Sequence, residues 1–236
     1  MTPDPQAEKQ GINIYRESAL HMALKAWFAV PGDRFEVLVD GHVVDVVRDD
    51  LLIEIQTGSF ANIKTKLTRL LPHHRIRLVY PIPQSRWIIK VNTAGETLSR
   101  RRSPKKADYV HLFKELVYIY PFMQHENLSF QALLIHDEEI RTDDGRGSWR
   151  RGGWSITDRR LSAVVDHRLF ESPSDFLTLL PPELPSLFTT AHLAAGLKQP
   201  PALARKMAYC LREMGLIEAM GKQGRAILYS LKSTGG

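Results

Sequence analysis

Three polar side chains interrupt two short apolar segments, and their spacing suits chemistry at a single site. Asp45 lies in the segment HVVDVV, and Glu54 and Gln56 lie in the segment LLIEIQ. Residues two apart on a strand share a face, so Glu54 and Gln56 are expected to project to the same side. If the connecting turn has an even number of residues, for instance Asp49 and Asp50 alone, the strand register places Asp45 directly opposite Glu54.

Two carboxylates in that arrangement repel each other unless they share a proton or a cation, because the Cβ atoms of opposed strand residues lie only about 5 Å apart. A hard divalent cation suits the pair, since Mg²⁺ is commonly held by one or two carboxylates and keeps several waters. We therefore expect Asp45 and Glu54 to bind Mg²⁺ or Mn²⁺.

The surrounding segments must form a hairpin and a covering helix to hold this pair. Apolar residues at three- and four-residue spacings predict helices over 17–28 and 60–71. Short runs rich in β-branched residues predict three successive strands and, after the second helix, a fourth. The predicted strands cover residues 35–39, 42–47, 51–56 and 75–82.

This order of elements, together with Asp45, eight intervening residues and then Glu54-Ile55-Gln56, resembles the PD-(D/E)xK (restriction-endonuclease-like) nuclease superfamily. In that family an Asp ends one strand and a Glu-x-Lys sequence lies on its hairpin partner. The resemblance covers about residues 12–82. It implies an α/β fold with a mixed central sheet flanked by helices, and metal-dependent hydrolysis of phosphodiester bonds. The metal would be held by Asp45, Glu54 and the Ile55 carbonyl.

The chain departs from that family at Gln56, where Lys is usual, although some restriction endonucleases of the fold carry Gln there. A Gln can orient an attacking water but supplies no positive charge. Lys64, at the edge of the apolar stripe of the 60–71 helix, is the candidate for that charge, whereas Lys66 is expected to face away. Glu17 matches a first-helix Glu that often joins the family's metal site; alternatively, it only stabilises the first turn of its helix.

The composition indicates a polyanionic partner in a reducing compartment. The chain has 236 residues and a formal net charge of +6, which favours DNA as the partner. Its one cysteine, Cys210, excludes an internal disulfide framework and suits the cytoplasm. No apolar run reaches the roughly 18 residues that a membrane helix needs. There is no Gly-x-Ser-x-Gly sequence and no phosphate-binding glycine loop, which disfavours nucleotide hydrolysis.

Two basic segments are candidates for phosphate contact. The segment 86–106 has seven cations and one acid, and its run SRRRSPKK predicts a solvated loop, with or without a role in binding phosphates. The connector DDGRGSWRRGGWS brings Trp149 and Trp154, which either stack on a base or pack onto the sheet. The expected DNA contacts in these segments are Arg100, Arg101, Arg102, Lys105, Lys106, Arg150 and Arg151.

Other polar clusters have simpler explanations. The pair His73-His74 fits an exposed turn, and the runs 136–139 and 166–167 fit the polar ends of strands predicted over 130–135 and 161–170. A further helix is predicted over 108–120.

Pro181-Pro182 predicts a boundary between a nuclease-like domain over 1–180 and a second domain over 181–236. Helices predicted over 187–197 and 202–214, then two strands around a glycine-rich tip, resemble a winged helix over about residues 186–232. Its second helix is expected to bury Cys210 and to present its outer face to a major groove. The alternative is a winged helix that binds protein or packs within its own chain. The expected DNA contacts are Arg205, Lys206, Tyr209 and Arg212 on that helix, with Lys222 and Arg225 at the wing.

Together these features predict a metal-dependent DNA endonuclease targeted by a winged helix. A nuclease core followed by a winged helix also resembles the DNA-cleaving subunit of some transposition systems, so restriction, repair, defence and transposition all remain open. A homodimer or a larger nuclease or transposition complex is compatible with this prediction. The alternative is a non-catalytic DNA-binding or regulatory protein that uses the nuclease fold as a scaffold, with Gln56 marking lost chemistry.

Overall fold

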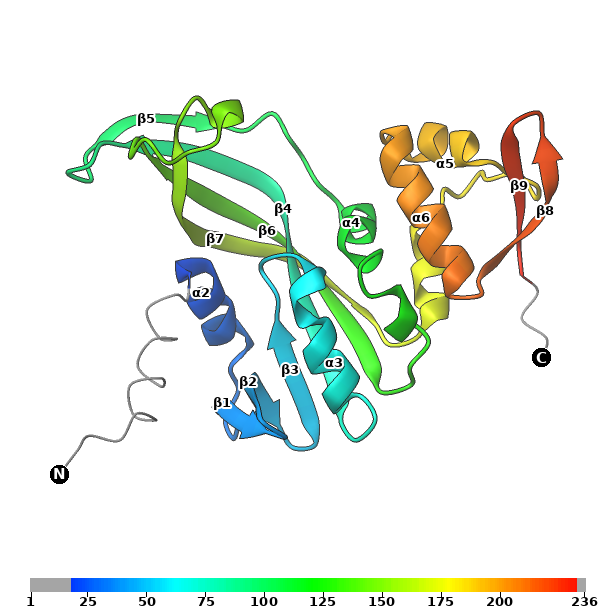
Figure 1. The fold of residues 1–236 in the computed structure, drawn as a ribbon, viewed down its shortest axis with the longest axis horizontal. Helices are drawn as coiled ribbons and strands as arrows, with labels where there is room; N and C mark the ends of the chain where they lie inside the picture. The colour runs from blue at the N-terminus through cyan, green and yellow to red at the C-terminus, as the bar shows by residue number, and fades with distance from the viewer. Residues whose placement is uncertain (1–17, 233–236) are drawn as a thin grey trace. The chain divides into compact units, whose positions relative to one another are not determined.

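The computed structural model describes residues 18–232 of the chain, so the candidate ligand Glu17 lies outside the described residues. It is a mixed α/β structure in which a central mixed sheet is flanked by helices (Figure 1). The strand order in this sheet is β1-β2-β3-β4-β6-β7, and β5 pairs with β4 outside that path. Strand β3 pairs antiparallel with β2 and parallel with β4. The predicted fold class is confirmed at this level.

The described elements have the following bounds. The helices are α2 (Ala19–Phe28), α3 (Lys64–Leu70), α4 (Phe113–Leu116), α5 (Thr190–Leu197) and α6 (Pro201–Glu213). The 3-10 turns are η2 (Phe60–Ile63), η3 (Tyr109–Leu112), η4 (Tyr120–Phe122), η5 (Trp149–Arg151) and η6 (Pro173–Leu179). The strands are β1 (Arg34–Val39), β2 (His42–Arg48), β3 (Leu51–Ile55), β4 (Arg75–Val91), β5 (Thr97–Arg102), β6 (Leu128–Thr142), β7 (Ser155–Phe170), β8 (Ile217–Gln223) and β9 (Ala226–Leu231).

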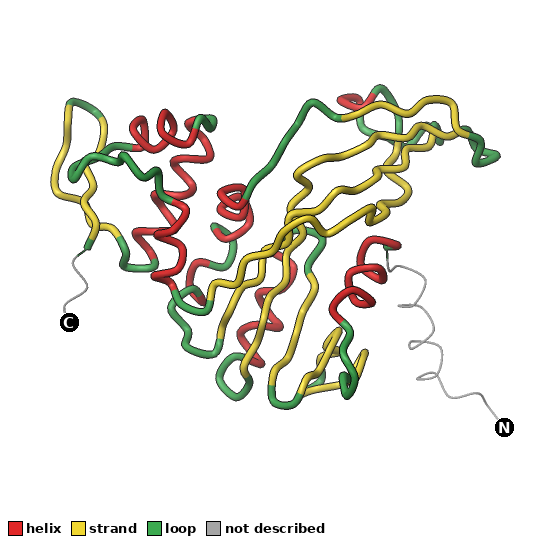
Figure 2. Tube along the Cα trace, turned by 180° about the vertical axis from the view of Figure 1, so that it is seen from behind, coloured by secondary structure: helices red, strands yellow, loops and turns green. Residues whose placement is uncertain are grey.

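The chain divides into two compact units. Unit 1 contains the described residues 18–31, 83–106 and 135–165, and unit 2 contains 32–82, 107–134 and 166–232. Figure 2 shows the strands in yellow, among them the long strands β4, β6 and β7. Each of these three strands contributes residues to both units. Residues 181–232 belong to the same unit as the hairpin of Asp45 and Glu54. The domain boundary between 180 and 181 stays a prediction.

In unit 2 the β2–β3 hairpin has the predicted register. A two-residue turn of Asp49 and Asp50 joins the strands, and Val46 faces Ile53 across the ladder. Asp49 adopts a left-handed φ of +51°, a conformation that Asp tolerates better than most residues. Four consecutive residues of β2, from Val44 to Val47, are buried. The length of the turn fixes the register, because one residue more or fewer would move each side chain of one strand to the other face.

The predicted helix over 60–71 is divided. Residues Phe60–Ile63 form the 3-10 turn η2, and the α-helix α3 begins only at Lys64. Ser59 caps the 3-10 turn by accepting a hydrogen bond from the Ala61 N–H. A 3-10 turn has 3.0 residues per turn rather than 3.6, so it changes the direction in which the residues of α3 point.

The prediction of a solvated loop for the run SRRRSPKK, residues 99–106, is correct only in part: residues 103–106 lie in neither helix nor strand, but 99–102 belong to a strand. Strand β4 continues through residue 91, and Thr97–Arg102 forms β5, which pairs antiparallel with it. All six residues of β5 are exposed. A strand this polar forms because the neighbouring strand satisfies its backbone and the arginine side chains stay in water; charged residues are common on such edge strands.

The predicted helix over 108–120 is also wrong as a continuous element. The segment forms three short pieces, η3, α4 and η4, that begin after an Asp108–His111 capping box. Pro121 disfavours α-helical geometry at Tyr120, which instead begins the 3-10 turn η4. The residues before it are aromatic and β-branched, types with low helix propensity.

The C-terminal part of unit 2 matches the predicted helices and strands. Helices α5 and α6 are followed by the β8–β9 hairpin, and an isolated bridge joins Phe188 to Tyr229. Thr189 caps α5, and Lys198 ends it with a φ of +52°. Cys210 is fully buried in the core, as predicted. None of the helices in the described part of the chain is long and apolar enough to span a membrane.

Burial raises the pKa of the Cys210 thiol to about 12. We predict that this thiol does not react with a disulfide reagent such as DTNB at pH 8 in the folded protein, because the reactive thiolate is scarcely populated and the sulfur is covered. In guanidinium chloride one thiol should react rapidly. Fast reaction of the native protein would contradict the placement of Cys210 in the core, and the release of thionitrobenzoate measures it directly.

Candidate functional site

The structure places Asp45 and Glu54 where the two strands of the hairpin separate. The β2–β3 ladder ends at Val46 opposite Ile53, and the next position of the same register sets Asp45 opposite Glu54. The Asp45 Oδ2 accepts a buried hydrogen bond of 2.7 Å from the Ile55 N–H. The Asp45 carboxylate thus takes the place of a main-chain acceptor at the next position along the two strands. Asp45 is itself only 9% exposed.

Lys66 lies beside this pair. Its ammonium forms an ion pair with the Glu54 Oε2 and donates a hydrogen bond of 2.5 Å to the Val43 carbonyl oxygen. The side chains of Lys66 and Glu54 are only 16% and 14% exposed. The prediction that Lys66 faces away is therefore wrong, whereas Lys64 is exposed. The 3-10 turn before α3 explains the difference, because a continuous α-helix from residue 60 would point these lysines in other directions.

Gln56 contributes to the shape of the site. Its backbone N–H donates to the Val79 carbonyl at 2.9 Å, and its Nε2 donates to the Ser59 carbonyl at 2.8 Å. Its side-chain amide therefore fixes the turn that leads into η2. The Phe60 N–H in that turn donates to Glu115 Oε2 at 3.1 Å.

The atoms that could bind a metal at Asp45 and Glu54 are few, and all of them are oxygens. Two carboxylates from neighbouring strands and a main-chain carbonyl at Ile55 match the oxygen ligands that Mg²⁺ and Mn²⁺ accept. No group of three or more His, Cys, Asp and Glu side chains gathers at metal-binding distance within residues 18–232. An ion held here would therefore depend on both carboxylates and on water.

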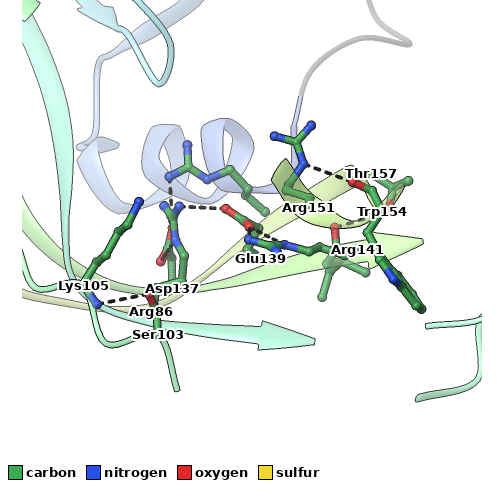
Figure 3. A network of polar contacts seen from close by, with 11 residues as sticks. Arg86, Ser103, Lys105, Asp137, Glu139, Arg141, Arg151, Trp154 and Thr157 are labelled. Carbon is green, nitrogen blue, oxygen red and sulfur yellow. Dashed lines mark hydrogen bonds and ion pairs between the residues drawn. The ribbon is translucent and has the colours of Figure 1, made fainter. Parts of the chain in front are cut away.

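A second polar cluster lies in unit 1 and was missed by the sequence prediction (Figure 3). Arg86 forms a two-bond fork with Asp137, with distances of 2.8 and 2.6 Å, and also donates to Glu139 at 2.8 Å. Arg141 donates twice to the other Glu139 oxygen, at 2.8 and 2.6 Å. Arg159 lies 3.3 Å from Asp137. Asp137 and Glu139 are 0% and 4% exposed.

The prediction that these two acids lie at a strand end is wrong, because both lie inside the long strand β6. Their carboxylate oxygens are occupied by guanidinium groups, so the cluster is a buried ion network rather than a metal site. Desolvation raises the pKa of Asp137, and the hydrogen bond from Arg86 opposes that rise. The alternation of Asp137 and Glu139 on one face of β6, with arginines in otherwise apolar neighbouring strands, was the available signal.

The basic residues of the chain are distributed unequally. The described part of unit 1 has fourteen Lys and Arg residues against seven Asp and Glu, whereas the described part of unit 2 has sixteen of each. On β5, Arg100 stacks over the Trp87 ring at 4.0 Å and pairs with Glu138 at 3.1 Å, and Arg102 donates to Ser85. The exposed predicted contacts in unit 1 are Arg100, Arg101, Arg102, Lys105, Lys106 and Arg150, and Arg151 is partly buried.

The outer face predicted for α6 is only half correct. Arg205 and Arg212 are exposed. Lys206 donates to the Lys114 carbonyl at 3.1 Å, and the Tyr209 ring packs edge-on against Tyr120 at 5.3 Å. Lys206 and Tyr209 thus face α4 and η4 rather than solvent. Lys222 and Arg225, at the tip of the β8–β9 hairpin, are exposed as predicted.

The sequence is similar to a described protein family and to a relative that covers nearly the whole chain. The model of the family described as "Domain of unknown function (DUF8091)" matches residues 18–171. A protein of Treponema pallidum (strain Nichols) with the name "Uncharacterized protein" is 32% identical over 228 residues, which cover 95% of this chain and 89% of the relative. No solved structure matches. The matched family region includes Asp45, Glu54 and Lys66 as well as the ion network of unit 1.

The ion network predicts a pH-dependent stability defect. Replacing Arg86 with Ala removes the two-bond partner of the buried Asp137 and leaves Glu139 with Arg141, so the free energy of unfolding should fall by about 3 kcal/mol at pH 8. The variant's Asp137 pKa should rise further, and the native state then binds more protons than the unfolded state. Because stability falls with rising pH under that condition, the defect should be smaller at pH 5 than at pH 8.

Urea unfolding at the two pH values measures this difference. The matched control is Arg101→Ala, which removes an exposed arginine of β5 and should change the free energy of unfolding by less than about 0.5 kcal/mol. Equal losses for Arg86→Ala at pH 5 and pH 8 would show that the buried carboxylates are not responsible.

Proposed function

This chain belongs to the DUF8091 family, and we propose that it is a metal-dependent DNA endonuclease whose centre is the acidic pair Asp45 and Glu54. The observation that supports the proposal most strongly is the register of the β2–β3 hairpin, which sets the two carboxylates opposite each other where the ladder ends. The element order α2, β1, β2, β3, α3, β4, with β3 parallel to β4, supports a restriction-endonuclease-like fold. Cleavage in restriction, repair, defence or transposition is compatible with it.

Asp45, Glu54 and the Ile55 carbonyl would hold Mg²⁺ or Mn²⁺. The bound ion would polarise the phosphodiester and lower the pKa of an attacking water. The Asp45 carboxylate on β2 accepts a hydrogen bond from the Ile55 N–H on β3. This bond holds the Asp45 carboxylate next to the main chain of Ile55, whose carbonyl is the third proposed ligand. This arrangement limits the reorganisation needed to bind an ion.

Lys66 replaces the charge that Gln56 does not supply. An ammonium has three donors, and two of those in Lys66 are directed at Glu54 and the Val43 carbonyl. The remaining donor can stabilise negative charge that develops on a phosphate oxygen bound next to Glu54. Gln56 positions the turn before η2 through Ser59 and does not need to contact the substrate.

DNA would be held largely through its phosphates. The excess of basic residues in unit 1 and the exposed Lys222 and Arg225 of the β8–β9 hairpin provide the charge. The arrangement of α5, α6, β8 and β9 supports a winged helix. Because Lys206 and Tyr209 are engaged within unit 2, we assign the DNA contacts of this segment to Arg205, Arg212 and the hairpin tip. Homodimers or a larger nuclease complex fit this mode of binding.

The alternative function is a non-catalytic DNA-binding protein built on the same fold. The ion pair between Lys66 and Glu54 favours it, because this pair already neutralises Glu54 without a metal. The two proposals differ in one measurable respect, which is cleavage.

The first test is nicking of supercoiled plasmid. We expect Mg²⁺- or Mn²⁺-dependent nicking that EDTA abolishes and that falls at least about a hundredfold in both Asp45→Asn and Glu54→Gln, because each variant removes a charged ligand of nearly unchanged shape. The matched control is Glu126→Gln, an exposed acid of unit 2, which should nick at the rate of the unaltered protein. Cleavage that survives both ligand substitutions would sink the proposal, and binding without cleavage on duplex, nicked and branched DNA would support the non-catalytic alternative.

The second test compares two lysines of one helix. Lys66→Ala should reduce nicking about a hundredfold, since the charge next to Glu54 is lost. Lys64→Ala removes an equal charge two residues away from an exposed position and should change the rate less than about twofold. Far-UV circular dichroism and thermal melting check that both variants fold. If Lys64→Ala is the impaired variant, the role given to Lys66 is wrong.

A further inference from the structure

Trp149 is the most exposed large hydrophobic residue in the described part of the chain, with 84% of its surface accessible. An indole of this size normally contributes to a core, and burying such a side chain is worth about 2–3 kcal/mol. Single exposed apolar residues are common on protein surfaces. The local structure around Trp149 decides whether this residue is one of them.

The loop that presents Trp149 is closed by its own hydrogen bonds. The Gly147 N–H donates to the Gly153 carbonyl at 2.9 Å, and the Gly152 N–H donates to the Trp149 carbonyl at 2.9 Å. Arg151 Nε donates to the Trp154 carbonyl at 3.0 Å. A Cβ at Gly147 would lie 2.1 Å from the Gly153 oxygen, so only glycine fits there. A hydrogen-bonded turn therefore holds the main chain at Trp149 in place. Less conformational entropy is then lost when a ligand stacks on the indole.

Cationic side chains lie over the rings of Trp87 and Trp154 in this unit. Arg100 covers the Trp87 ring at 4.0 Å and Lys90 covers the Trp154 ring at 4.1 Å. The guanidinium of Arg150, at 5.6 Å from the Trp149 ring, is farther away, and the Trp149 ring stays accessible. Trp149 thus differs from Trp87 and Trp154 because its surface remains open beside a cation.

We propose that unit 1 is a binding site for single-stranded nucleic acid, in which a base stacks on Trp149 and the neighbouring phosphates pair with Arg150 and Arg146. An open indole accepts the face of any base, and base faces are accessible only when the strand is unpaired. The twofold excess of basic over acidic residues in unit 1 supplies the charge complementarity. This binding does not require cleavage at Asp45 and Glu54.

The test is fluorescence anisotropy with the full chain and a fluorescein-labelled thymidine oligonucleotide in EDTA, so that metal and cleavage play no part. The oligonucleotide should bind more tightly than a duplex of equal length. Trp149→Ala should weaken binding of the single strand about tenfold and leave duplex binding nearly unchanged. Trp149→Phe, which keeps an aromatic face, should restore most of the affinity.

Binding of unlabelled oligonucleotide should also quench tryptophan fluorescence, and Trp149→Phe should lose that quenching while it still binds.

The matched control is Leu98→Ala, which removes another exposed apolar side chain of unit 1, 59% exposed on β5. It should bind the single strand with unaltered affinity. Unchanged affinity in Trp149→Ala, or an equal loss for single strand and duplex, would overturn the proposal. Because these measurements contain no metal, their result is independent of the nicking assays.

Discussion

The two-residue turn at Asp49 and Asp50 is the constraint on which the candidate site depends. It sets the register of β2 against β3, because side chains alternate between the two faces of a strand and a slip by one residue would exchange them. With that register fixed, Asp45 has to lie opposite Glu54, and the end of the ladder leaves the Ile55 N–H for the Asp45 carboxylate. A hairpin with one more residue in its turn would direct the two acids to opposite faces, and the pair would not form.

The hairpin could be predicted from sequence because its signals are local. Alternating apolar residues, a polar turn and a count of residues determine which side chains face each other. The position of Lys66 could not be predicted in this way, since it depends on where a 3-10 turn gives way to an α-helix. The change of phase over four residues brings Lys66, rather than Lys64, next to Glu54.

The long strands were underestimated for a different reason. Hydrophobic periodicity ends a strand where charged residues begin, but Asp137 and Glu139 continue β6 because Arg86 and Arg141 neutralise them inside the protein. The pairing of Arg86 with Asp137 spans 51 positions of the sequence, so hydrophobic periodicity does not reveal it. The same limit applies to α6, where Tyr209 was expected to face outward by helical count but packs on Tyr120 of a segment far away in the sequence. Glu17 lies outside the described residues, so its contribution to the site stays a prediction.

The most direct test of the central claim is whether Asp45 and Glu54 bind one divalent ion together. Titration of the full chain with Mn²⁺, followed by electron paramagnetic resonance of the free ion, measures this without any nucleic acid. We predict one Mn²⁺ site that weakens at least about tenfold in Asp45→Asn and in Glu54→Gln, with little further loss when the two changes are combined, because each removes a ligand of the same ion. A Mn²⁺ site whose affinity is unchanged in either single variant, or a folded protein that binds no Mn²⁺, would contradict the claim.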